Sequence, residues 1–107
     1  MGQFRTGNPA YAAYVDAAYD VDPDAGTGQF YRSTHEDDGV PQIYPRTIGY
    51  DHHGVEYWNR DPTGPGNTYV CTPDDTTECN GGTVGVGINP AHLTYYGHTV
   101  VIGGACE

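Results

Sequence analysis

The 107-residue sequence predicts a mainly β protein, a small antiparallel barrel or sandwich with one short α-helix near the N-terminus. Short segments rich in Val, Ile, Tyr and Thr recur along the chain, and these residues suit the pleated surface of a sheet. Gly, Pro, Asn and Asp separate the segments at close spacing, as in small all-β folds. The length suits one domain, so we expect residues 1–107 to share a single core.

The helix is expected over residues 8–20, where apolar side chains repeat at helical spacing. Asn8 is a favourable N-cap, and Pro9 follows in the first turn, where a missing N–H is tolerated. Pro23 restricts the residue before it, so the helix should end near there. The apolar stripe is expected to pack on the sheet, with an exposed aromatic docking face as the alternative. It consists of Tyr11, Tyr14, Val15, Ala18 and Tyr19.

The rest of the chain divides into six expected strands, each bounded by strong turn formers. In the segment 84–88 a branched residue alternates with glycine, so one face is apolar and the other has no side chains. Such a strand lets another strand, a partner or a ligand approach its backbone closely. The expected strands cover residues 29–32, 42–50, 55–59, 68–72, 83–88 and 98–102.

The charge balance argues against several kinds of partner. The formal net charge is −10, and the four basic side chains other than His are scattered arginines. Binding a nucleic-acid backbone needs clustered cations that displace counterions, so we expect no such binding. No stretch approaches the ~20 apolar residues of a membrane helix, and the first residues lack the apolar run of a secretory signal. We therefore expect a protein partner and no membrane contact.

The three cysteines suggest one disulfide. Cys71 and Cys79 flank a polar loop, which predicts a disulfide at a hairpin tip; two reduced thiols on adjacent strands are the alternative. Cys106 is left over, either free or paired with another chain. No Cys-x-x-Cys pair occurs, so a structural zinc site is not expected.

Two groups of residues suggest metal ligands without completing a known pattern. Asp20, Asp22 and Asp24 alternate as in a calcium loop, but the glycine and the final glutamate of that loop are not at their required positions. We therefore expect a solvated acidic turn and leave calcium binding open. His52 and His53 would point to opposite faces of an extended segment, which disfavours one shared metal. We predict no metal and no cofactor.

The sequence contains no recognisable nucleophile motif. Ser33 is its only serine, and no Gly-x-Ser-x-Gly elbow surrounds that residue. We therefore predict no catalytic residues and favour a protein that is not an enzyme.

One set of residues resembles the fungal guanyl-specific ribonucleases. That family is similar in length, with an N-terminal helix, a small antiparallel sheet and a penultimate cysteine, where this sequence has Cys106. The segment His35-Glu36-Asp37, followed by Tyr44-Pro45 and Gly54, is similar to the part of those enzymes that leads into the catalytic strand.

The resemblance implies ribonuclease chemistry with a glutamate base and a histidine acid, matched here by Glu56 and His98. It also implies an arginine that steadies the phosphate. Arg46 stands where the family has a histidine after Tyr-Pro. If three of Glu56, His35, His98 and Arg46 meet in one concave pocket, the enzyme is favoured.

Composition favours a protein that binds rather than reacts, because Tyr and Trp bring contact area with few rotatable bonds. We predict a non-catalytic structural or interaction module, best a virion accessory subunit of a phage head or tail. It would act as a homo-oligomer or in a larger assembly, in a virion or outside the cell. The alternatives are a small secreted ribonuclease-like hydrolase and a calcium-stabilised secreted binding domain. The expected interface residues are Tyr11, Tyr14, Tyr57, Trp58, Tyr95 and Tyr96.

Overall fold

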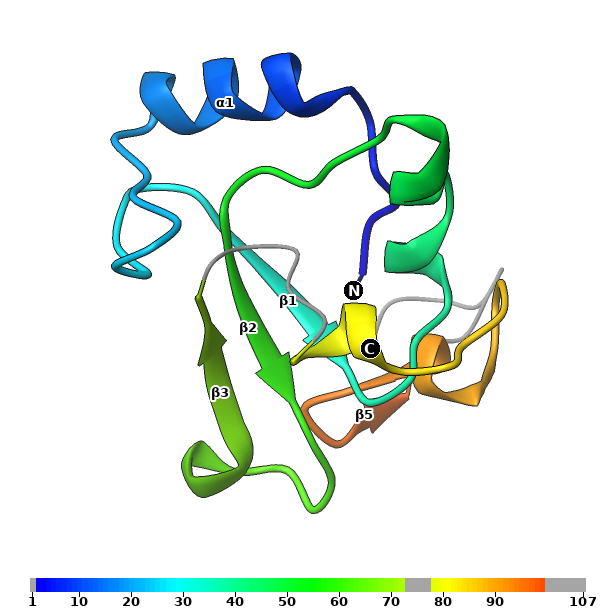
Figure 1. The fold of residues 1–107 in the computed structure, drawn as a ribbon. Coiled ribbons are helices and arrows are strands. Elements are labelled where there is room, and N and C mark those ends of the chain that lie inside the picture. The colour runs from blue at the N-terminus through cyan, green and yellow to red at the C-terminus, as the bar shows by residue number, and fades with distance from the viewer. Residues whose placement is uncertain (1, 73–77, 100–107) are drawn as a thin grey trace.

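The computed structural model of the chain describes residues 2–72 and 78–99, and Figure 1 shows how its elements are arranged. Helix α1 (Pro9–Ala18) precedes a three-stranded sheet with the order β1-β2-β3, and a two-stranded ribbon of β4 and β5 follows. The strands are β1 (Tyr31–His35), β2 (Val55–Asn59), β3 (Thr68–Cys71), β4 (Thr94–Tyr95) and β5 (His98–Thr99). Short 3-10 turns lie between them at Val40–Gln42, Arg46–Ile48, Pro65–Asn67, Asn80–Gly82 and Pro90–Leu93.

The larger sheet is mixed, so the predicted antiparallel barrel or sandwich is wrong. β1 and β2 run parallel, with Tyr31 opposite Val55, whereas β2 and β3 run antiparallel. A parallel pair needs a crossover connection, because the chain must return to the same end of the sheet. Residues 36–54 form this crossover, and they contain two 3-10 turns in place of the expected strand at 42–50.

Some of the other expected strands form, and others do not. The segment 55–59 is β2, the segment 68–72 overlaps β3, and the segment 29–32 overlaps the start of β1. The expected strand at 83–88 is irregular and makes a single bridge, between Gly39 and Gly87. Of the last expected strand, residues 98 and 99 form β5, and residues 100–102 lie outside the described part of the chain.

Helix α1 begins as its sequence predicts, but it packs through a different face. The Asn8 side chain accepts a hydrogen bond from the Tyr11 N–H at 2.9 Å. The helical residues that become buried are Ala12 and Asp16 rather than the tyrosine stripe, and Tyr14 remains 73% exposed. The small Ala12 lets the helix approach the protein closely, whereas the tyrosine hydroxyls stay in water. Figure 1 places α1 beyond the end of the sheet at which β2 begins.

The interior of the sheet is polar as well as apolar. Glu56 is 1% exposed, and its carboxylate accepts hydrogen bonds from Thr34 Oγ1 at 2.5 Å and from Arg32 Nη2 at 3.4 Å. Arg32 lies opposite Glu56 in the parallel register, so these two buried charges are paired with each other. The buried apolar side chains of the described residues are Ala12, Val40, Val55, Cys71, Cys79, Ala91 and Tyr95.

A disulfide joins Cys71, at the end of β3, to Cys79, which is the pairing expected from the sequence. It fixes β3 to the 3-10 turn at Asn80–Gly82. Cys106 lies outside the described residues.

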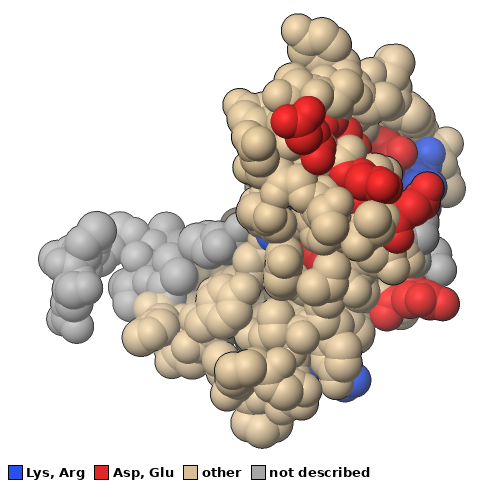
Figure 2. Space-filling model, turned by 90° about the vertical axis from the view of Figure 1, so that its left-hand side faces the viewer, with Lys and Arg blue, Asp and Glu red and all other residues tan. Residues whose placement is uncertain are grey.

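The exterior is strongly acidic. Figure 2 shows acidic side chains gathered over the upper half of one face. In the acidic turn after α1, the Asp22 carboxylate accepts the backbone N–H groups of Asp24 and Ala25, each at 3.1 Å. Among the described residues, no helix is both long enough and apolar enough to span a bilayer.

Candidate functional site

A buried aspartate lies just beyond the carboxyl end of β1. Asp38 is 0% exposed and follows the last residue of that strand by three positions. Its Oδ1 accepts the Val40 N–H at 2.9 Å, and its Oδ2 accepts the Tyr95 hydroxyl. The carboxyl ends of parallel strands are a frequent location of functional side chains, because loops from neighbouring strands meet there.

His92 faces this carboxylate from the 3-10 turn at Pro90–Leu93. Its Nδ1 lies 3.0 Å from Oδ2 and 3.1 Å from Oδ1 of Asp38. Because a carboxylate only accepts, Nδ1 carries a hydrogen, and in the neutral ring the lone pair is then on Nε2. Within residues 2–72 and 78–99, no hydrogen bond occupies Nε2. A histidine held in this tautomer by a buried aspartate is oriented to act as a general base.

Asn89 fixes the turn that carries His92. Its side-chain oxygen accepts the His92 N–H at 3.3 Å, which caps the turn, and Pro90 occupies the first position. Its side-chain nitrogen donates to the Asp37 carbonyl at 2.7 Å. One side chain therefore ties the turn to the loop that contains Asp38.

Tyr95 binds the carboxylate oxygen of Asp38 that the Val40 backbone does not contact. Its ring is 5% exposed, and its hydroxyl donates to Asp38 Oδ2. Burial, followed by the hydrogen bond to Asp38 and its negative charge, raises the pKa of Tyr95 far above its usual value. The phenol therefore keeps its proton and serves as a permanent donor to the carboxylate.

The glycine-rich segment 84–88 lies against the Asp38 loop. A side chain at Gly85 would place its Cβ 1.8 Å from the Asp37 carbonyl oxygen, so only glycine fits. Gly87 bridges to Gly39. The apolar side chains of this segment point outward instead, and their exposed fractions are 91%, 84% and 64% for Val84, Val86 and Ile88. The bare face of the segment thus packs beside the site, and the apolar face stays open.

The residues matched to the ribonucleases do not meet in one pocket. Glu56 is buried against Arg32 and Thr34, whereas His98 is exposed on β5. Arg46 is exposed, and its Nε lies 3.8 Å from Asp51 Oδ1. A catalytic arrangement of Glu56, His98 and Arg46 is therefore absent from the described residues.

The predicted interface residues are spread over different environments. Tyr11, Tyr14 and Tyr96 are exposed, and Tyr57 and Trp58 are half-buried. Tyr95 is buried against Asp38, so its assignment to a surface is wrong.

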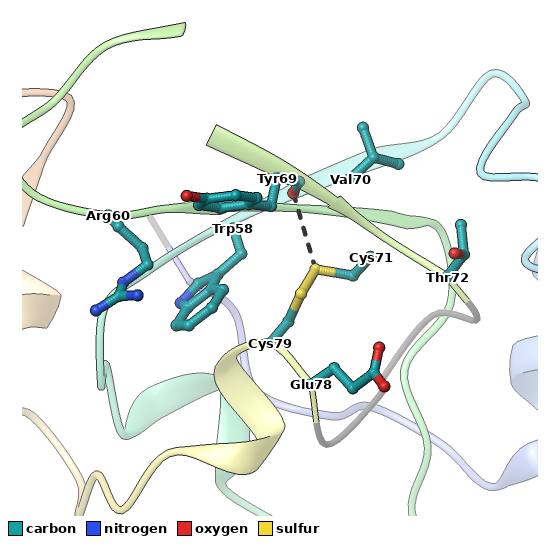
Figure 3. Close-up of a pocket in the computed structure, with 8 residues that line it drawn as sticks. All are labelled: Trp58, Arg60, Tyr69, Val70, Cys71, Thr72, Glu78 and Cys79. Carbon is teal, nitrogen blue, oxygen red and sulfur yellow. Dashed lines mark hydrogen bonds between the residues drawn. A yellow bond between two sulfur atoms is a disulfide. The ribbon is translucent and has the colours of Figure 1, made fainter. Parts of the chain in front are cut away.

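A separate pocket of about 400 Å³ lies around Trp58 and the disulfide (Figure 3). The Arg60 guanidinium lies 5.2 Å from the centre of the Trp58 ring, and Tyr69 packs on the same ring. Asp38 and His92 do not line this pocket.

Sequence reasoning missed both members of the buried pair. Asp38 stands within an acidic run, and His92 is one of five histidines, so neither is distinctive in the sequence. They are 54 positions apart, and no local spacing connects residues at that separation. The one available signal is Asn89-Pro90, a capped turn that ends on a histidine.

The chain is similar to fungal lipases. It is 38% identical over 101 residues to the secreted mono- and diacylglycerol lipase 1 of Fusarium solani, covering 89% of this chain and 27% of that protein. It is 39% identical over 99 residues to a lipase of Rhizomucor miehei, covering 91% and 24%. A solved lipase of Yarrowia lipolytica superposes with a TM-score of 0.78 at 27% identity, over 94% of this chain and 38% of that one. No protein-family model matches the chain.

These matches correct the predicted fold class and function. The chain spans about a quarter of the length of the curated relatives. The similar structures are lipases with the α/β-hydrolase fold. The predicted mainly β fold class is therefore wrong, as the mixed sheet also shows. The predicted virion subunit is wrong, and so is the ribonuclease alternative, because the relatives are lipolytic enzymes. An extracellular location agrees with the secreted relative. A homo-oligomer and a protein partner stay predictions.

Proposed function

We propose that these 107 residues supply the aspartate–histidine pair of a secreted lipolytic hydrolase. The observation that carries the proposal is the contact of His92 Nδ1 with the buried Asp38 carboxylate, which leaves Nε2 available. The similarity to fungal lipases supports an ester of glycerol and fatty acids as the substrate and a location outside the cell.

The pair would act on a serine nucleophile. His92 Nε2 takes the proton of the serine hydroxyl while the oxygen attacks the ester carbonyl carbon. It then gives that proton to the alcohol that leaves when the carbon–oxygen bond breaks, and the acyl group stays on the serine. The same nitrogen then takes a proton from water while the water oxygen attacks the acyl carbon; the bond between that carbon and the serine oxygen breaks, the serine oxygen regains the proton from Nε2, and the fatty acid leaves. Asp38 stays ionised throughout and stabilises the imidazolium.

Ser33 is not suited to this role. Its Oγ lies 2.6 Å from the Tyr96 hydroxyl, and that tyrosine is exposed on the ribbon side of the molecule. In α/β-hydrolases the nucleophile stands in a Gly-x-Ser-x-Gly turn and precedes the acid and the histidine along the chain; Ser33 precedes Asp38 and His92, but no such turn surrounds it. We propose that the serine belongs to the part of the enzyme that the longer relatives have and these 107 residues do not include.

Ester hydrolysis by the full enzyme that contains these residues tests the proposal. We expect the enzyme to release fatty acid from emulsions of mono- and diacylglycerol, and titration of the released acid measures the rate. Asp38→Asn and His92→Gln should each lower kcat by about 10⁴-fold, because the base loses its orientation or is removed.

His98→Gln is the matched control. This histidine is exposed on β5, so its variant should hydrolyse both substrates at the wild-type rate. Equal activity of His92→Gln and wild type, or loss of activity in His98→Gln alone, would contradict the proposal.

A further inference from the structure

A second histidine and carboxylate lie behind the turn that carries His92. His35, the last residue of β1, is 2% exposed. Its Nδ1 lies 2.9 Å from the carbonyl oxygen of Ala91, the residue directly before His92. Its Nε2 lies 3.1 Å from Asp61 Oδ1.

The chemistry of these contacts fixes which atom donates. A backbone carbonyl only accepts, so His35 Nδ1 carries a hydrogen and donates it to Ala91. A carbonyl buried in a short turn needs such a donor, because an unpaired buried polar group is costly. The Asp61 carboxylate also only accepts, so the contact at the other ring nitrogen is a hydrogen bond as well only when both nitrogens carry hydrogens, and the two contacts together then fix the orientation of the ring. Asp61 is itself held by its N–H, which donates to Glu36 Oε1 at 2.7 Å.

His35 also contacts the residue that holds Asp38. The centres of the His35 and Tyr95 rings are 5.4 Å apart, and the Tyr95 hydroxyl donates to the Asp38 carboxylate. One side chain thus touches the supports of both members of the pair, through Ala91 for His92 and through Tyr95 for Asp38.

We propose that His35, anchored by Asp61, is a positioning residue for His92. Its hydrogen bond to Ala91 sets the height of the Pro90–Leu93 turn above β1 and therefore the approach of His92 Nδ1 to Asp38. The catalytic consequence of this role rests on the proposed function, but the positioning itself does not.

Three substitutions separate the two contacts of the His35 ring. In His35→Asn the amide nitrogen is two bonds from Cβ, as Nδ1 is, so it can still donate to Ala91. In His35→Gln the amide nitrogen is three bonds from Cβ, as Nε2 is, so it reaches towards Asp61 instead. His35→Leu fills the space and makes neither contact.

The readout is the Nδ1–H proton of His92 in the full chain labelled with ¹⁵N-histidine. We expect this proton to exchange with solvent about tenfold faster in His35→Gln and His35→Leu, because the turn opens more often. His35→Asn should restore slow exchange. In the enzyme, kcat should follow the same order, and KM should stay within about twofold of wild type.

Each outcome is decisive. Equal exchange in wild type and His35→Leu, or equal acceleration in His35→Asn and His35→Leu, would overturn the positioning role. Thermal unfolding of each variant shows whether the variant has lost its fold. Slow exchange in His35→Asn, beside fast exchange in His35→Leu, would then be a difference that a folding defect does not explain. If exchange follows the expected order but neither the wild-type enzyme nor any variant hydrolyses acylglycerols, the positioning role stands and the proposed hydrolase function is wrong.

Discussion

At the scale of single residues, the environment of Asp38 determines what the site can do. Its carboxylate has no exposed surface, and it accepts hydrogen bonds from His92, Tyr95 and the Val40 backbone. A buried carboxylate is tolerated only where donors replace the lost water. The hydroxyl of Tyr95 is therefore part of the site rather than part of the apolar core.

Tyr95→Phe should destabilise the protein and weaken the site, because it removes one donor and leaves a buried oxygen of Asp38 short of a partner. We expect a loss of about 1–3 kcal/mol in the free energy of unfolding, measured by urea titration. Tyr14→Phe is the control, since Tyr14 is 73% exposed and should change stability little. A Tyr95→Phe protein as stable as the control would show that the hydroxyl contributes nothing.

His53 should make stability depend on pH. Burial lowers its pKa below the ordinary value of 6.5, with the Asp16 carboxylate opposing and the Arg32 guanidinium adding to the effect. The unfolded chain therefore takes up a proton at higher pH than the folded chain does. The contribution of His53 to stability is complete above 6.5 and is lost as the pH falls through the folded pKa.

His53→Gln should accordingly reduce the fall in the free energy of unfolding between about pH 7.5 and pH 5. Urea titrations at several pH values measure this slope. The exposed His98 supplies the control, because His98→Gln should keep the wild-type slope. An unchanged slope in His53→Gln would mean that burial does not perturb this histidine.

At the scale of elements, local signals predict where some segments form but not how they pair. The Asn8 cap and Pro9 predict the start of α1, and the segments at 55–59 and 68–72 are found in β2 and β3. The parallel pairing of β1 with β2 depends on a crossover of many residues, and no local pattern encodes it.

The segment 84–88 shows why strand propensity misleads. Its valines and isoleucine suit a sheet, yet Gly85 and Gly87 pack their bare backbone on the loop that carries Asp38. These glycines let the backbone approach its neighbour closely. The alternation of branched residues and glycine predicts such an approach but does not identify the surface that is approached.

Gly85→Ala should displace the Asp38 loop. The new Cβ would lie 1.8 Å from the Asp37 carbonyl oxygen, so backbone must move on one side or the other. We expect a loss of about 1–3 kcal/mol in the free energy of unfolding, together with reduced ester hydrolysis. Gly66→Ala is the control, since nothing lies within 4 Å of a Cβ at that position. Equal stability of the two variants would contradict the close packing seen here.

At the scale of the whole molecule, composition predicts the surface but not the chemistry. The acidic exterior follows directly from the net charge of −10. The site, in contrast, depends on two residues that are 54 positions apart, and many sequences of this composition lack such a pair. Only the folded crossover and the capped turn at Pro90–Leu93 bring Asp38 and His92 together.

The most direct test of the account is a covalent adduct with a p-nitrophenyl alkylphosphonate, which transfers its phosphorus to an activated serine hydroxyl. In a crystal structure of the labelled full enzyme, we expect the modified serine Oγ within about 3 Å of His92 Nε2. His92→Gln should abolish the labelling. A label on any other residue, or a modified serine beyond hydrogen-bond reach of His92, would contradict the assignment of Asp38 and His92 as the acid–base pair.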